Sequence, residues 1–131
     1  MTSRSPADTI AAYFAAIRRL DRAGWLACFA EHAVSHDPVG APPHVGIDGL
    51  RRYFDGFMAQ VSSVSLIEED VYVCGQRAAV KWIGRGFGKA AEGLGKPFVF
   101  EGIDLFEFDA HGRIVKVEGY WEPSRLMAQL A

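Results

Sequence analysis

The spacing of apolar residues changes near residue 62, and this change restricts the chain to an α+β fold. Before it, apolar side chains recur every three or four residues, which is the spacing of one helix face. After it, β-branched and aromatic residues recur at a shorter period that is typical of strands. Hairpin-linked strands need no crossover helices, so we expect three N-terminal helices packed on one face of a curved, mostly antiparallel sheet.

The first helix has a complete start signal. Ser5 can cap the helix, Pro6 occupies its first position, and Asp8 follows three residues after the cap. The apolar stripe of this helix includes Tyr13 and continues to a predicted end near Asp21. Because one whole face is apolar, it must be buried against the rest of the protein.

The remaining elements follow from the same patterns. A second, short helix contains Trp25, Leu26 and Phe29, and an extended piece follows at 33–36. A proline-rich loop then leads to a third helix that begins at 47 and ends near 61. Four strands are predicted over 64–73, 78–87, 97–108 and 113–122, with turns at 74–76, 93–95 and 109–112 and a helical tail at the end.

The composition argues against several classes of function. A chain of 131 residues, 50% of them hydrophobic, can fill the core of one domain, which we expect to span 1–131. Fourteen basic and sixteen acidic residues give a net charge of −2, so the chain lacks the electrostatic field that holds nucleic acid. No apolar run approaches the roughly 20 residues needed to cross a bilayer, and no membrane association is expected.

The cysteines and histidines give no sign of a metal or cofactor. Cys28 and Cys74 lie far apart without the spacing of a redox or metal motif, and no signal peptide precedes them, so we expect a reduced, cytoplasmic setting. The histidines match no metal-ligand spacing. The glycines at 84–88 open no helix and indicate a bend rather than a phosphate-binding loop.

Asp104 is the first candidate for chemistry. Alternation along the third long strand places it on one face with Phe98, Phe100, Phe106 and Phe108. A carboxylate in apolar surroundings loses hydration, which raises its pKa and favours the neutral acid. Asp104 is therefore either a neutral hydrogen-bond donor in a pocket or a structural group that a bulge or a water molecule leaves solvated.

Asp37 and Tyr13 are candidates with an ordinary structural explanation beside the functional one. Asp37 stands where an extended piece meets a loop, and loops expose functional side chains. An Asp before Pro is also a common turn former. Tyr13 lies on the apolar stripe of the first helix, where a buried phenol needs a hydrogen-bond partner, although tyrosine is more often plain core filler.

Taken together, these three residues carry a resemblance to the bacterial ketosteroid isomerases of the nuclear transport factor 2-like and SnoaL-like superfamily. The run His-Asp-Pro-Val-Gly-Ala-Pro-Pro-His-Val-Gly at 36–46 is similar to the family's loop, whose aspartate is a proton-shuttling base. Tyr13 precedes Asp37 by the same distance as the family's oxyanion-hole tyrosine precedes its base. The strand around Asp104 resembles the one with the protonated acid, and Tyr120-Trp121 resembles the C-terminal aromatic pair.

The resemblance implies a site and a reaction. Asp37 would be the base, and Tyr13 and protonated Asp104 would donate to the oxyanion in a cofactor-free isomerase of a 3-oxo-Δ5 steroid or a similar enolisable ketone. The implied partners are a small apolar ligand and a second copy of the chain. Alternation and the resemblance assign the pocket walls to Phe54, Val80, Trp82, Phe98, Phe100, Phe106, Val117 and Trp121.

This interpretation leaves two alternative functions open, and the sequence departs from the isomerase family at three places. A SnoaL-like polyketide cyclase would use the same kind of acid to start an aldol closure, and a pocket that only binds an apolar ligand, or a dimerisation module, is a second possibility. Phe54 stands where the better-known isomerases have a tyrosine that supports the oxyanion-hole tyrosine, and Phe29 replaces a pocket tyrosine. The resemblance also requires an insertion between Gly84 and Pro97, which includes two lysines and lies at a pocket edge or subunit contact.

Overall fold

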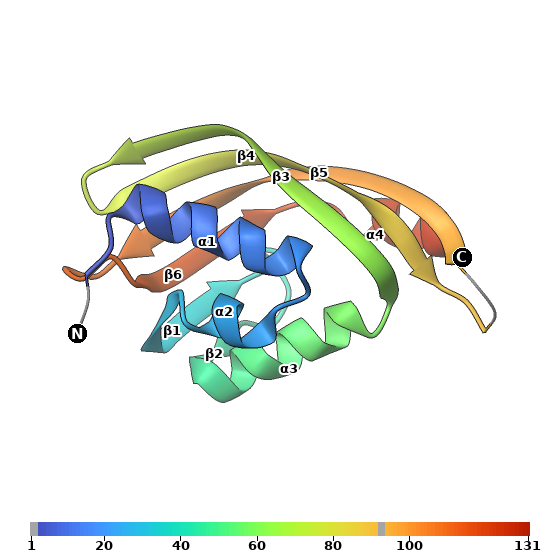
Figure 1. Cartoon of the computed structure of the whole chain (residues 1–131), viewed down its shortest axis with the longest axis horizontal. Coiled ribbons are helices and arrows are strands. Elements are labelled where there is room, and N and C mark those ends of the chain that lie inside the picture. The colour runs from blue at the N-terminus through green and yellow to red at the C-terminus, as the bar shows by residue number, and fades with distance from the viewer. Residues whose placement is uncertain (1–2, 92–93) are drawn as a thin grey trace.

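The computed structural model describes residues 3–91 and 94–131. Over these residues the chain forms four helices and a sheet of six strands (Figure 1). The helices are α1 (Pro6–Arg18), α2 (Arg22–Leu26), α3 (Gly46–Met58) and α4 (Pro123–Leu130). The strands are β1 (Phe29–His36), β2 (His44–Val45), β3 (Val61–Cys74), β4 (Arg77–Lys89), β5 (Leu94–Phe108) and β6 (Ile114–Tyr120).

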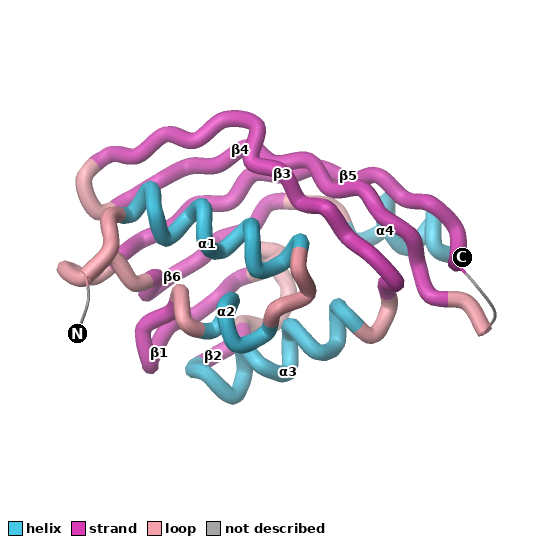
Figure 2. Tube along the Cα trace, viewed as in Figure 1, coloured by secondary structure: helices cyan, strands magenta, loops and turns pink. Residues whose placement is uncertain are grey.

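The sheet is mixed and strongly curved. Its strand order is β2-β1-β6-β5-β4-β3, and neighbouring strands are antiparallel except for β1 and β6, which are parallel. Helices α1, α2 and α3 lie inside the curve of the sheet, while α4 lies along β5 (Figure 2). This arrangement confirms the predicted α+β class, with three helices on one face of a curved, mostly antiparallel sheet and the predicted tail as a fourth helix.

Helix α1 begins as the sequence predicts. The Ser5 hydroxyl accepts a hydrogen bond from the backbone N–H of Asp8 at 3.1 Å, which satisfies a helix N–H that would otherwise lack a partner. The helix ends earlier than predicted because Leu20 adopts a φ of 54°, which an α-helix cannot contain. Asp21 instead caps α2 by accepting from the N–H of Gly24 at 3.0 Å.

The predicted boundary between the second helix and the first strand is wrong. Phe29 is the first residue of β1 rather than part of α2, which ends at Leu26. β1 therefore starts before the extended piece predicted at 33–36. The cause is long-range: Phe29 pairs with Ile114 of β6, whose N–H donates to the carbonyl of Cys28 at 2.9 Å. Strand pairing here outweighs the local helical spacing.

Strands β3, β4 and β5 extend beyond their predicted ends. The range of the predicted insertion, between Gly84 and Pro97, covers the end of β4 and the start of β5, and part of the turn predicted at 93–95 lies outside the described residues. Helix α4 docks beside β5, where the side-chain amide of Gln129 accepts a hydrogen bond from the N–H of Val99 and donates one to its carbonyl, at 2.8 Å each. Within the described ranges no helix is long and apolar enough to span a membrane.

Candidate active site

Three neighbouring strands bring Asp37, Gly119 and Asp104 together. Asp104 on β5 lies directly opposite Gly119 on β6. Strand β1 pairs with β6 as far as its last residue, so Asp37, the next residue, lies beside Gly119 on the other side. The N–H of Val39 donates to the carbonyl of Gly119 at 2.9 Å and holds the loop after β1 against β6. Two acids that are distant in sequence therefore flank one glycine.

Gly119 leaves the space into which both carboxylates lean. A Cβ built on Gly119 would lie 2.4 Å from Oδ1 of Asp37 and 3.0 Å from Oδ1 of Asp104. Side-chain carbons do not approach carboxylate oxygens so closely, so any larger residue would force at least one carboxylate away. The absence of a side chain at this position is what allows the two carboxyl groups to share one space.

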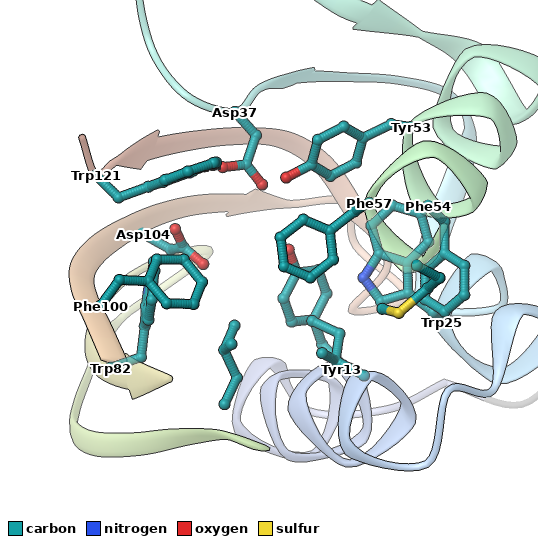
Figure 3. A pocket seen from close by; sticks show the side chains of 13 residues that line it. Tyr13, Trp25, Asp37, Tyr53, Phe54, Phe57, Trp82, Phe100, Asp104 and Trp121 are labelled. Carbon is teal, nitrogen blue, oxygen red and sulfur yellow. Dashed lines mark hydrogen bonds between the residues drawn. The ribbon is translucent and has the colours of Figure 1, made fainter. Parts of the chain in front are cut away.

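The two acids and Tyr13 line the same hollow on the inner side of the sheet (Figure 3). The hollow and its open mouth enclose about 470 Å³ between the lining atoms, of which the centre of a water molecule can reach about 40 Å³, and most of the lining is apolar. The three side chains come from different elements: Tyr13 from α1, Asp37 from the end of β1 and Asp104 from β5. The full lining is Tyr13, Ile17, Trp25, Asp37, Tyr53, Phe54, Phe57, Met58, Leu66, Trp82, Phe100, Asp104 and Trp121.

Asp104 has the surroundings of a protonated acid. Its side chain is only 2% exposed, and Oδ1 has no hydrogen-bond partner among the described residues. Burial raises the pKa of Asp104 well above its ordinary value, and the charge of Asp37 raises it further. The indole N–H of Trp82 opposes this shift weakly, and it too lacks a partner of good hydrogen-bond geometry within the described chain. The surroundings of Asp104 therefore favour its protonated form.

Asp37 lies in the same hollow but has hydrogen-bond donors. The indole Nε1 of Trp121 donates to its Oδ1 at 2.6 Å. Burial raises the pKa of Asp37 overall, and Trp121, the hydroxyl of Tyr53 and the nearby His44 reduce that rise. Asp37 thus has three groups that favour its ionised form, whereas Asp104 has one. The pKa values of both carboxyl groups are raised, that of Asp104 further, so Asp37 is the acid that ionises more readily.

Tyr13 is a neutral phenol in this environment. Burial raises its pKa well above the ordinary value, and the charges of Asp104 and Asp37 raise it further. Tyr53 adds to this effect, whereas the indole N–H of Trp25, which faces Tyr13 in Figure 3, lowers the pKa. Phe54 also lines the hollow but has no hydroxyl with which to bond Tyr13. The polar group next to Tyr13 on the α2 side of the hollow is therefore the indole of Trp25.

The sequence model of the SnoaL-like domain family matches residues 10–117 of the chain. The chain belongs to the SnoaL-like domain family. The matched range contains Tyr13, Asp37 and Asp104 and all strands except the last part of β6.

Solved structures with the same fold cover nearly the whole of this SnoaL-like domain. An NTF2-like protein of unknown function from Burkholderia pseudomallei superposes with a TM-score of 0.81 at 17% identity, covering 96% of this chain and 97% of that chain. A protein with a ketosteroid isomerase-like fold from Catenulispora acidiphila, in complex with trimethylamine, has a TM-score of 0.80 at 19% identity, with coverages of 97% and 94%. These likenesses confirm the nuclear transport factor 2-like fold.

Two further neighbours are described as enzymes. The epoxide hydrolase/cyclase-like enzyme SalBIII, which has a role in pyran ring formation in the polyether salinomycin, has a TM-score of 0.79 at 20% identity and covers 92% of each chain. A candidate polyketide cyclase from Pseudomonas putida has a TM-score of 0.78 at 18% identity, with coverages of 98% and 99%. At these identities the likeness concerns the fold alone.

Half of the predicted wall residues line the hollow of the SnoaL-like domain and half do not. Phe54, Trp82, Phe100 and Trp121 line it. The other four face inwards as alternation predicts, but they are packed in the closed core. Phe106, for example, packs against Tyr13 and Phe14 of α1, with ring centroids 5.2 and 6.5 Å apart. The residues assigned to the core rather than to the wall are Val80, Phe98, Phe106 and Val117.

Sequence reasoning missed Tyr53 as a site residue. Tyr53 has the helical spacing of the apolar residues in the third helix, and its hydroxyl is the signal in the sequence, because a buried phenol needs a hydrogen-bond partner. Phe29, which was expected to replace a pocket tyrosine, is buried but is not part of the lining. Among the described residues no group of three or more His, Cys, Asp or Glu side chains is arranged to hold a metal ion.

Proposed function

We propose that this SnoaL-like domain is a cofactor-free acid–base enzyme that enolises a hydrophobic ketone. One observation carries the proposal: Asp104 presents a buried oxygen without a partner in the described chain, in the same hollow where Asp37 accepts a hydrogen bond from Trp121. A buried polar atom without a partner is costly unless a ligand satisfies it. A carbonyl oxygen is the ligand atom that a protonated carboxyl group would bind.

The chemistry follows from the two protonation states. Ionised Asp37 removes a proton from the carbon next to the carbonyl group, and negative charge then develops on the carbonyl oxygen. Protonated Asp104 and the Tyr13 hydroxyl would donate hydrogen bonds to that oxygen, and these bonds strengthen as the charge forms. The apolar lining excludes water and so strengthens the electrostatic interactions inside the hollow.

Ring closure of a polyketide-like chain is the reaction we favour for the enolate. The enolate carbon attacks a second carbonyl group of the same molecule and forms a carbon–carbon bond, and the second carbonyl oxygen becomes a hydroxyl group by taking a proton. The proton left on Asp37 balances the one taken up, so no oxidant or reductant is needed. Two neighbours of this fold are described as cyclase-like or as a candidate polyketide cyclase, which agrees with this choice.

Double-bond isomerisation of a 3-oxo-Δ5 steroid is the second candidate. It is favoured by the presence of Tyr13, Asp37 and Asp104 in one hollow with the indole of Trp121. It needs the same first step, after which Asp37 would return the proton at a different carbon.

The first step can be tested without knowing the natural substrate. A panel of hydrophobic ketones, including a Δ5-3-ketosteroid and linear polyketone chains, is incubated in D2O, and deuterium uptake beside the carbonyl group is followed by NMR. We expect enzyme-catalysed uptake that falls by a factor of about 10²–10⁴ in Asp37→Asn, the range of a lost general base. Asp48→Asn, at an exposed position paired with Arg51, is the matched control and should behave like the native protein.

The same panel separates the candidates. A cyclised product from a polyketone supports ring closure, and ultraviolet absorbance of the conjugated enone supports steroid isomerisation. Ligands that bind the hollow without any deuterium uptake, with equal affinity for the native protein and Asp37→Asn, would contradict the enzyme proposal and support a pocket that only binds.

A homodimer through the outer face of the sheet belongs to the same proposal. This face carries exposed apolar side chains that cross-strand pairing brings together, such as Ile103 opposite Tyr120. Light scattering should give a mass near twice 14.4 kDa, and Ile103→Lys should return it to the monomer value. A native mass of 14.4 kDa at micromolar concentration would contradict the dimer.

A further inference from the structure

The Asp37 carboxylate lies between two donors on opposite sides. The indole of Trp121, which follows β6, donates to Oδ1 at 2.6 Å. The hydroxyl of Tyr53, from α3, points towards the carboxylate from the other side (Figure 3), and its presence there lowers the pKa of Asp37. Gly119 lies against the same carboxylate, because a Cβ there would meet its Oδ1 at 2.4 Å. The carboxylate is therefore restrained from three directions.

Tyr53 is itself held in place by aromatic neighbours. The ring of His44 on β2 packs against it, with centroids 4.4 Å apart and planes inclined by 34°. The ring of Trp25 lies on another side at 6.3 Å. Because β2 pairs with β1, which ends just before Asp37, the strand that carries His44 and the strand that leads to the acid form one unit. The phenol therefore has little freedom to follow a carboxylate that rotates away.

We propose that Tyr53 is a positioning residue that, together with Trp121, fixes the Asp37 carboxylate in one orientation. Asp37 then takes up a proton from one carbon of the substrate and does not carry it to a distant carbon. The inference rests on the proposed function and narrows it. A proton shuttle across two carbons would require the carboxyl group to turn and to lose its charge-assisted hydrogen bonds. Ring closure needs no such movement, because the second proton is delivered to an oxygen atom.

Polar and ionisable groups surround Asp37 from several elements of the described chain. Tyr53 comes from α3, His44 from β2, Asp104 from β5 and Tyr13 from α1, and Trp121 follows β6. Of these, Trp121, Tyr53 and His44 favour the ionised form of Asp37. Removing the Tyr53 hydroxyl therefore has one predicted direction: the pKa of Asp37 rises.

Tyr53→Phe tests the proposal because it keeps the ring and removes only the hydroxyl. The pKa of Asp37 is measured in the ligand-free protein by NMR of ¹³C-labelled aspartate carboxyl groups, with the Asp37 signal assigned by its absence in Asp37→Asn. We expect an upward shift in Tyr53→Phe. Tyr72→Phe, at a position of β3 that is 65% exposed and outside the hollow, is the matched control and should leave the pKa of Asp37 unchanged. An unchanged Asp37 pKa in Tyr53→Phe would overturn the proposal.

A second readout follows the proton itself. A ketone deuterated beside its carbonyl group is supplied with a double bond placed to accept the label at a second carbon. The native protein should lose the label to solvent, and Tyr53→Phe should deliver a larger fraction of it to the second carbon. Efficient transfer of the label by the native protein would overturn the proposal. Trp121→Phe removes the other donor and should act in the same direction if Tyr53→Phe does not fold.

The two readouts keep the inference separate from the function on which it rests. The pKa measurement needs no substrate, so an upward shift without any deuterium uptake from the ketone panel would support the positioning role and reject the enzyme. Loss of deuterium uptake in Asp37→Asn together with an unchanged Asp37 pKa in Tyr53→Phe would support the enzyme and reject the positioning role of Tyr53.

Discussion

The carboxyl groups of Asp37 and Asp104 meet over a single glycine. Their Oδ1 atoms lie 2.4 and 3.0 Å from the position that a Cβ of Gly119 would occupy, on the strand between the two acids. Two carboxyl groups this close in an apolar hollow cannot both be ionised without a large electrostatic cost. The hydrogen bond from Trp121 favours the charge on Asp37, whereas Asp104 has an oxygen without a partner among the described residues.

Gly119→Ala should separate the acids and impair proton transfer. The new methyl group would overlap Oδ1 of Asp37, so the carboxylate or the strand must move. We expect the ketone-dependent deuterium uptake to fall by about 10²-fold, the cost of a misplaced catalytic group, and the free energy of unfolding to fall by about 1–3 kcal/mol. Uptake kinetics and urea denaturation measure the two effects.

Gly56→Ala is the control for that substitution. Gly56 lies in α3, and a Cβ there would meet nothing within 4 Å. Alanine should stabilise the helix by about 0.5–1 kcal/mol and leave the uptake rate unchanged. Native activity in Gly119→Ala would show that the shared space is not required.

Asp104→Asn should stabilise the protein at neutral pH and reduce the dependence of its stability on pH. Burial raises the pKa of Asp104, so the native state keeps a proton that the unfolded chain releases as the pH rises above about 3.9. The free energy of unfolding of the native protein therefore decreases from that pH upwards, until the pH reaches the raised pKa of Asp104 in the folded state. Asparagine does not ionise, so the gain in unfolding free energy should be small at pH 3 and grow towards pH 8, as measured by urea denaturation.

Asp109→Asn should show the opposite dependence and serves as the reference. Burial acts against ionisation there, but the backbone N–H groups of Arg113 and His111 lower the pKa of Asp109 overall. Its carboxylate therefore contributes stability above the ordinary pKa of an aspartate, which is lost as the pH falls through the lower folded value. If Asp104→Asn followed the same pH trend as Asp109→Asn, the neutral state of Asp104 would be ruled out.

The pH profile of ketone enolisation should be bell-shaped. Asp37 must be ionised to take up a proton, so the rate rises with pH through the pKa of Asp37. Asp104 must be protonated to donate, so the rate falls as the pH passes through its raised pKa. In Asp104→Asn the alkaline fall should move upwards to the range where Tyr13 ionises. An alkaline limb that stays in place would assign it to another group.

Val80→Ala and Phe100→Leu should separate the closed core from the hollow. Val80 is fully buried and outside the lining, so its truncation should lower the unfolding free energy by about 2 kcal/mol and leave ligand affinity unchanged. Phe100 lines the hollow, so leucine there should change the affinity for hydrophobic ketones. Calorimetric titration and urea denaturation give the two quantities. A loss of ligand affinity in Val80→Ala would show that Val80 does line the hollow.

The sequence determined the class of fold and the start of the first helix. Apolar periodicity depends only on local spacing, and the cap at Ser5 is a contact between residues three apart, so both can be read along the chain. Alternation also placed Asp104 on the inner face of its strand. The resemblance added Tyr13 and Asp37, and all three side chains line the hollow.

Only the tertiary structure decided which inward residues meet an open space and which groups surround each acid. Alternation cannot separate Phe100 from Phe106, because both face inwards and the difference lies in what α1 covers. The contact of Tyr53 with Asp37 and the gap at Gly119 each join segments that are distant in sequence. The protonation of a buried acid depends on such long-range neighbours, and no local pattern records them.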